Sequence, residues 1–122
     1  MPDQLNYFLF LDDIRDPHHA FVYTKQEMFV TNPWIVVRSF DEFKNHIESF
    51  GMPHFISFDH DLGELDHTEN WKVEQSGYDC ALWLIEYCMD TNCDLPGYYC
   101  HSMNPIGKDK INGLLESFQR SR

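Results

Sequence analysis

Side chains that can bind a metal, hold a phosphate or move a proton follow each of four short apolar runs in this sequence. These side chains are Asp12, Asp13 and Arg15, then Arg38, then Asp59, His60 and Asp61, and finally His101 and Ser102. Each group alone has an ordinary explanation, because aspartate is common in turns and arginine in ion pairs. Because each of the four groups comes directly after an apolar run, we predict that they form one site.

Two histidines and two arginines indicate phosphate chemistry. An imidazole titrates near neutral pH, so His60 and His101 could act as general acid and general base on opposite sides of a phosphorus atom. Arg15 and Arg38 could stabilise the equatorial oxygens, where charge accumulates during phosphoryl transfer.

Four carboxylates, those of Asp12, Asp13, Asp59 and Asp61, would repel a phosphate unless a cation lay between them. A hard divalent ion such as Mg²⁺ or Mn²⁺, held by oxygen ligands, resolves this conflict. We therefore predict that these four residues are the metal ligands.

The elements that must position these residues are strands alternating with helices. Wholly apolar runs favour parallel strands that are buried on both faces. We expect strands at 7–11, 34–37, 54–58 and 98–100, and helices at 39–50, from 76 to about 89, and from 104 to about 118. The stretch 14–33 is long enough for a crossover, but Pro17 and the β-branched residues make a clean helix doubtful there. The polar stretch 64–75 resembles a binding loop in its length.

This order predicts an open α/β sheet of about four mainly parallel strands with flanking helices, in one domain covering residues 1–122. Such sheets bind ligands at the carboxyl ends of their strands, where the four groups stand.

The amino-acid composition limits the classes of partner that the protein is expected to bind. The 122 residues carry 9 Lys+Arg and 20 Asp+Glu, a formal net charge of −11. This charge argues against binding long nucleic acids or an anionic membrane surface. No apolar stretch is long enough for a membrane span, and the four cysteines lack paired spacing, so we expect a cytoplasmic protein with reduced thiols.

Asp12, Asp13 and Asp59 resemble the acidic residues of the receiver domains of response regulators. That resemblance implies a flavodoxin-like fold in which the acidic pair binds Mg²⁺ and Asp59 accepts a phosphoryl group. The sequence departs from it because no fifth strand ending in lysine is found, and Lys108 and Lys110 do not occupy the place of that lysine.

A closer resemblance covers nearly the whole chain. The blocks that carry it are Leu11-Asp12-Asp13-Ile14-Arg15, Val37-Arg38-Ser39, 57–63 (SFDHDLG), Gly77-Tyr78-Asp79 and 101–107 (HSMNPIG). They resemble the cyclic-phosphate processing receiver-like family, which implies a receiver-like sheet without the fifth strand and an enzyme that opens cyclic phosphates on nucleotides or nucleotide-derived signals.

We therefore expect hydrolysis of a small cyclic phosphodiester, with His60, His101, Asp59 and Asp13 as catalytic residues. Arg15 and Arg38 would hold the phosphate, and Ser102 and Asn104 would orient it by hydrogen bonds. Water would be activated by a carboxylate-bound metal or by one histidine, and the other histidine, for which His101 is favoured, would protonate the departing sugar oxygen. Two alternatives stay open: a protein that sequesters a cyclic nucleotide without cutting it, and a signalling module phosphorylated on Asp59.

Overall fold

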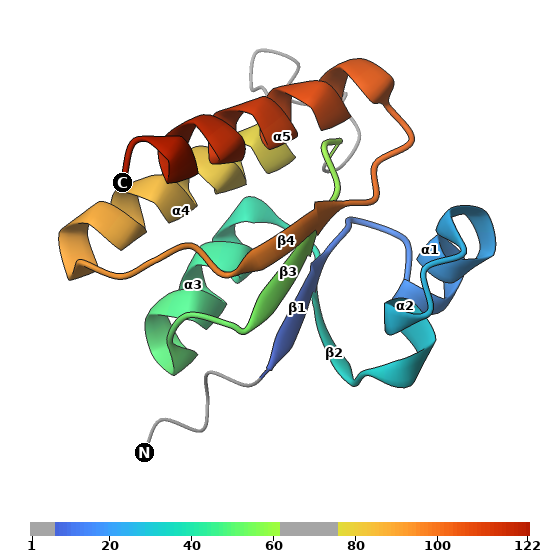
Figure 1. Cartoon of the computed structure of the whole chain (residues 1–122). Helices are drawn as coiled ribbons and strands as arrows, with labels where there is room; N and C mark the ends of the chain where they lie inside the picture. The colour runs from blue at the N-terminus through green and yellow to red at the C-terminus, as the bar shows by residue number, and fades with distance from the viewer. Residues whose placement is uncertain (1–6, 62–75) are drawn as a thin grey trace, which may run out of the picture.

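The computed structural model describes residues 7–61 and 76–122, and their centre is a four-stranded parallel sheet (Figure 1). Its strands are β1 (Phe8–Leu11), β2 (Trp34–Val37), β3 (Phe55–Phe58) and β4 (Gly97–Cys100), in the order β2-β1-β3-β4. All three pairings are parallel and in regular register. The predicted open α/β sheet of four parallel strands is confirmed. The predicted loop 64–75 lies outside the described residues.

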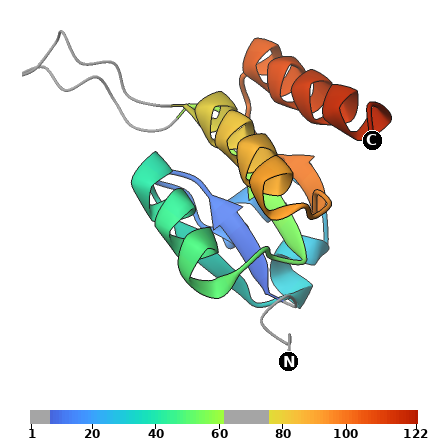
Figure 2. The same cartoon turned by 90° about the vertical axis from the view of Figure 1, so that its left-hand side faces the viewer.

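Helices cover both faces of the sheet (Figures 1 and 2). The helices are α1 (Pro17–Thr24), α2 (Met28–Thr31), α3 (Phe40–Phe50), α4 (Gly77–Thr91) and α5 (Pro105–Arg120). Helices α3, α4 and α5 pack on one face, and α1 and α2 lie on the other.

Side-chain caps begin the three longer helices where the sequence predicts them. The Ser39 hydroxyl accepts the backbone N–H of Glu42 at the start of α3, and Ser76 and Asp79 form a reciprocal capping box at the start of α4. Asn104 caps α5, and a proline follows at its first position, where a missing N–H costs nothing.

The stretch between β1 and β2 is more helical than the sequence suggests. Pro17 begins α1 instead of breaking it, because the first helical residue needs no N–H donor. The helix ends at Lys25, whose backbone has a left-handed φ of 61°, and a single short turn, α2, follows.

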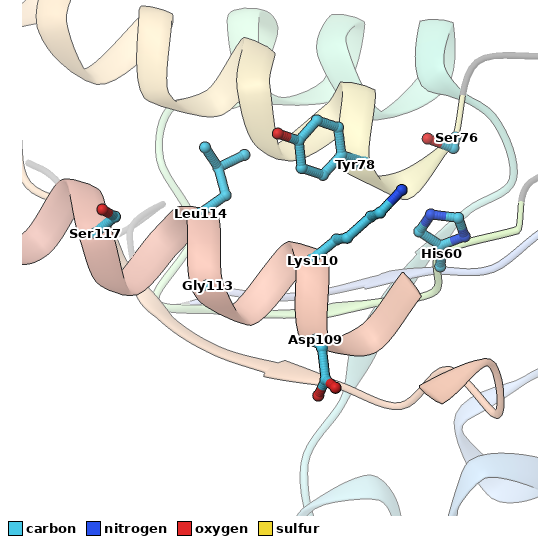
Figure 3. Close-up of a pocket in the computed structure, with 8 residues that line it drawn as sticks. All are labelled: His60, Ser76, Tyr78, Asp109, Lys110, Gly113, Leu114 and Ser117. Atoms are coloured by element: carbon cyan, nitrogen blue, oxygen red, sulfur yellow. The ribbon is translucent and has the colours of Figure 1, made fainter. Parts of the chain in front are cut away.

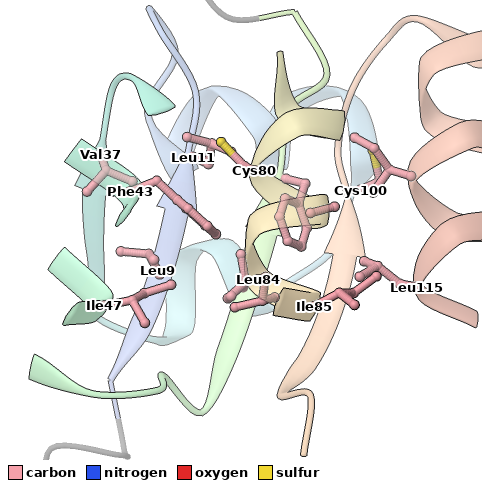
Figure 4. Packing of buried hydrophobic residues seen from close by; sticks show 14 residues of the cluster. Leu9, Leu11, Val37, Phe43, Ile47, Cys80, Leu84, Ile85, Cys100 and Leu115 are labelled. Atoms are coloured by element: carbon pink, nitrogen blue, oxygen red, sulfur yellow. The ribbon is translucent and has the colours of Figure 1, made fainter. Parts of the chain in front are cut away.

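Apolar residues of β1 alternate between the two faces of the sheet. Leu9 and Leu11 belong to the larger cluster with α3, α4 and α5, shown in Figure 4, and Phe10 belongs to a smaller one with α1 and α2. Burying each such side chain contributes about 1.5–3 kcal/mol. This packing on both faces fixes the strand ends, where the chemical groups lie. The four cysteines form no disulfide, and no helix among the described residues is long and apolar enough to cross a membrane.

Candidate active site

Asp12, Asp59 and His101 lie side by side at the carboxyl edge of the sheet. Each directly follows its strand and extends the ladder by one backbone hydrogen bond: Asp12 N donates to Val37 O (3.1 Å), Asp59 N to Leu11 O (3.0 Å) and His101 N to Phe58 O (2.9 Å). All three residues are at least 97% buried. One side-chain N or O atom of each lies within 4.8 Å of the others, so the three side chains form an acidic cluster.

Asp12 is held as a carboxylate. Its Oδ1 accepts the backbone N–H groups of Ile14 (3.0 Å) and Arg15 (2.8 Å), and its Oδ2 lies 3.0 Å from His101 Nε2. Burial alone would raise the pKa of Asp12, but these hydrogen bonds outweigh it and lower the pKa to about 2. Asp12 therefore stays ionised at neutral pH.

His101 is enclosed completely, and both of its ring nitrogens are engaged. Its Nδ1 lies 2.7 Å from Ser57 Oγ, and the ring stacks on Phe10 with centroids 4.4 Å apart. Because Asp12 is an ionised acceptor, Nε2 carries the proton and Nδ1 accepts the hydroxyl proton of Ser57. Burial lowers the pKa of His101, which keeps the ring neutral. Both ring nitrogens of His101 are therefore bonded within the protein, to Ser57 and to Asp12.

Asp59 has the opposite character to Asp12. Burial and the neighbouring charge of Asp12 raise the pKa of Asp59 to about 7, against the opposing effect of Arg15 and of a backbone N–H bond from His60. Two adjacent carboxyl groups whose pKa values are pushed apart are a frequent arrangement for acid and base chemistry.

This acidic cluster fits a hard divalent cation. The two carboxylates of Asp12 and Asp59 are suitable oxygen donors, and the repulsion that raises the pKa of Asp59 is what a bound cation would relieve. Of the four predicted metal ligands, Asp12 and Asp59 belong to the cluster. Asp13 does not, although it lines the adjoining pocket, and the side chain of Asp61 is 67% exposed and lies 2.9 Å from His60 Nδ1.

A pocket of about 420 Å³ opens beside the acidic cluster and is called the acid pocket below. It is lined by Asp13, Ile14, Arg15, Asp59, Asp61, Ser102, Met103 and Asn104. Six of the predicted site residues therefore come together here. Arg15 brings the positive charge: its guanidinium lies 3.7 Å from Asp12 Oδ2 and 5.8 Å from the centre of the Tyr23 ring. Asn104 is also the cap of α5, so the positive end of that helix dipole lies at the pocket.

Arg38 does not line the acid pocket, and its predicted role in holding phosphate is not supported by its placement. Its guanidinium donates to the backbone oxygen of Arg15 (2.7 Å) and pairs with Asp16 (2.8 Å). Because the same guanidinium also donates to the backbone oxygen of Asp12 (3.4 Å), Arg38 holds the loop that carries Asp12 and Arg15.

His60 and His101 line different cavities, whereas the sequence led us to expect them across one cleft. The His60 ring lies against Gly107 in the first turn of α5, where a Cβ would be 2.2 Å from its Cγ. The ring lines a second cavity, between α4 and α5. Gly77 is needed for the same reason of space, since a Cβ there would lie 1.7 Å from the backbone oxygen of Asp59.

Sequence reasoning missed Ser57 and Tyr23. Ser57 is the one polar residue in the apolar run that becomes β3, and that exception was the signal of a buried partner. Tyr23 donates its hydroxyl proton to the backbone oxygen of His101 (2.7 Å), and nothing in the local sequence indicates that contact.

Comparison with known proteins agrees with this geometry. A family model described as the cyclic-phosphate processing receiver domain matches residues 7–117, nearly the whole chain. No curated protein and no solved structure matches.

Proposed function

The chain belongs to the family of cyclic-phosphate processing receiver domains, and from this premise we propose that it is a hydrolase that opens a cyclic phosphodiester on a nucleotide or a nucleotide-derived small molecule. The observation that carries the proposal is the buried pair of Asp12 and Asp59, whose pKa values are about 2 and about 7, beside the Arg15 guanidinium in the acid pocket. The pocket thus combines a group that exchanges protons near neutral pH with a cation for the phosphate.

Arg15 and the first turn of α5 bind the phosphate. The guanidinium is about one third exposed and therefore reachable by a ligand. The Ser102 hydroxyl accepts the backbone N–H of Asn104 (3.1 Å) and so fixes the loop that leads into α5. In this proposal, the Arg15 guanidinium and the N-terminal end of α5 stabilise the negative charge that develops on the phosphate oxygens.

Asp59 and His60 transfer the protons. The carboxylate of Asp59 takes a proton from water as the water oxygen bonds to phosphorus, and the bond from phosphorus to one sugar oxygen breaks. That sugar oxygen takes a proton from the ring of His60, whose Nδ1 lies 2.9 Å from Oδ1 of Asp61, a residue that lines the acid pocket. The product is an acyclic phosphate monoester, and solvent returns both residues to their starting protonation. This assigns the acid to His60, which has an exposed edge, and not to the enclosed His101.

His101 positions Asp12. The hydrogen bonds from Ser57 to His101 and from His101 to Asp12 hold that carboxylate in its charged form beside Asp59.

A divalent cation, Mg²⁺ or Mn²⁺, fits between Asp12 and Asp59, and when bound it would neutralise the phosphate and acidify the attacking water. The cation and a proton on Asp59 are alternative ways to neutralise the same carboxylate pair. Activity with EDTA, compared with activity in added Mg²⁺ or Mn²⁺, distinguishes them.

The test is a screen of 2′,3′-cyclic and 3′,5′-cyclic mononucleotides and of cyclic dinucleotides, with products separated by chromatography. We expect ring opening of at least one class, a loss of about 100-fold or more in Asp59→Asn and His60→Gln, and wild-type rates in Asp90→Asn. Asp90 is an exposed carboxylate on α4, away from both cavities, and so is a matched control. If no cyclic phosphate is opened with either metal supplied, the proposal is wrong.

The two alternatives have their own results in the same experiment. A cyclic nucleotide that is recovered intact after denaturation indicates sequestration. Asp59 stands where a receiver accepts its phosphoryl group, so intact-mass measurement after incubation with a small phosphodonor tests the signalling alternative.

A further inference from the structure

A second cavity lies between α4 and α5 and has a volume of about 580 Å³ (Figure 3). Its lining combines a cation (Lys110) and a carboxylate (Asp109) with an aromatic ring, hydroxyl groups and an apolar side chain. The residues used below are His60, Ser76, Tyr78, Lys110, Gly113 and Leu114, and the cavity is called the α4–α5 groove.

Lys110 brings an ammonium group to the groove in a chain of net charge −11. Figure 3 shows its side chain reaching from α5 toward the first turn of α4, with Tyr78 and His60 on either side. Within residues 7–61 and 76–122 no carboxylate lies within ion-pair distance of its ammonium group, and Asp109 points away from it. The Tyr78 hydroxyl also has no hydrogen-bond partner in those ranges. A cation and a phenol are thus both available to a ligand.

Gly113 keeps the floor of the groove open. It stands in the middle of α5, where glycine destabilises a helix by about 1 kcal/mol relative to alanine. Its φ is not positive, and a Cβ there would meet nothing within 4 Å. Neither backbone conformation nor packing requires this glycine, and its missing side chain leaves open space where α5 lines the groove.

His60 joins the groove to the acid pocket. The ring of His60 lines the groove, Asp61 lines the acid pocket, and the two side chains are 2.9 Å apart. The two cavities therefore adjoin at the contact between the side chains of His60 and Asp61.

We infer that the α4–α5 groove binds a nucleotide unit, with its phosphate at Lys110 and its base against Tyr78 and the floor at Gly113, and that the substrate is therefore larger than a cyclic mononucleotide. The inference about the substrate rests on the proposed function, and the groove itself can be tested without hydrolysis. Aromatic rings and a lone cation suit a base and a phosphate, respectively.

The first experiment measures binding of AMP to the intact chain by calorimetry. We expect Gly113→Leu to weaken binding at least 10-fold by filling the floor and Lys110→Gln to weaken it by removing the cation, while Arg15→Gln in the acid pocket leaves binding unchanged. Lys110 is exposed, so its variant folds even if Gly113→Leu does not. Absence of AMP binding, or binding that is lost in Arg15→Gln and kept in the two groove variants, overturns the inference.

The second experiment compares two substrates of the ring type found in the screen, a mononucleotide and a dinucleotide ending in the same cyclic phosphate. We expect Gly113→Leu to raise KM at least 10-fold for the dinucleotide and less than 2-fold for the mononucleotide. Equal effects on both substrates overturn the inferred substrate size. If AMP binds the groove and no cyclic phosphate is opened, the proposed hydrolase function fails and the groove site stands.

Discussion

Asp59→Asn should make the metal-free protein more stable at alkaline pH. Asp59 is 97% buried, and its pKa rises from 3.8 to about 7 on folding, because burial and Asp12 disfavour its charge. Below pH 4 the carboxyl is protonated in both the folded and the unfolded chain, so no penalty applies. Between pH 4 and pH 7 the unfolded chain ionises first and the folded state loses stability, and above pH 7 the loss is complete at about 4 kcal/mol.

The assay is denaturant unfolding in EDTA at pH 5 and pH 8. We expect Asp59→Asn to raise the free energy of unfolding by up to about 4 kcal/mol at pH 8 and by less than half of that at pH 5. The amide keeps an oxygen that can accept the backbone N–H of His60, so the change removes chiefly the charge. Asp90→Asn, at an exposed position, is the control and should change stability at neither pH.

Added Mg²⁺ should stabilise the wild type at pH 8 and have little effect on Asp59→Asn, because a cation relieves the same repulsion that the substitution removes. The reasoning is refuted if Asp59→Asn is no more stable than the wild type at pH 8 in EDTA.

Three further predictions follow from contacts around the site. Ser57→Ala should lower the free energy of unfolding by about 1–3 kcal/mol, because it leaves a buried imidazole nitrogen unpaired; a denaturation midpoint equal to that of the wild type would contradict it. Gly77→Ala should destabilise the chain, since its Cβ would lie 1.7 Å from a backbone oxygen, whereas Gly113→Ala, with nothing near its Cβ, should stabilise it by about 1 kcal/mol. Thermal melts of the two alanine variants test this as a matched pair, and the same sign for both would refute it. Arg15→Gln should raise KM for a cyclic phosphate about 10-fold or more, because it removes the cation in the acid pocket. Arg38→Gln should chiefly lower the melting temperature, because it removes a bond that holds the loop. Steady-state kinetics and thermal melts of both variants test this, and a raised KM in Arg38→Gln with none in Arg15→Gln would show that Arg38 binds the phosphate.

The sheet and the acidic cluster could be predicted from the sequence. Parallel strands end at one edge, so residues that directly follow buried runs must lie close together, and Asp12, Asp59 and His101 do. Caps at Ser39, Ser76 and Asn104 gave the helix starts because they depend on neighbours within three residues.

The directions of side chains beyond the strand ends could not be predicted. His60 stands one residue after Asp59, but its ring turns to Gly107 because that glycine, far away in sequence, leaves room for it. Arg38 follows β2 as expected, yet its length lets it reach loop carbonyls near Arg15. Such contacts depend on the packing of distant elements, which residue types and spacing do not specify.

The chain leaves the sheet edge at His60 and returns at Gly77, where the backbone N–H of Gly77 donates to the backbone oxygen of His60 over 2.7 Å. The intervening stretch therefore starts and finishes at one fixed point. As a general rule of loop closure, doubling the number of residues between two anchored points costs only about 0.6 kcal/mol. Because this bond ties the start of α4 to the residue after Asp59, a change in the number of residues between the two anchors leaves both in place, which makes this junction suitable for grafting a recognition segment.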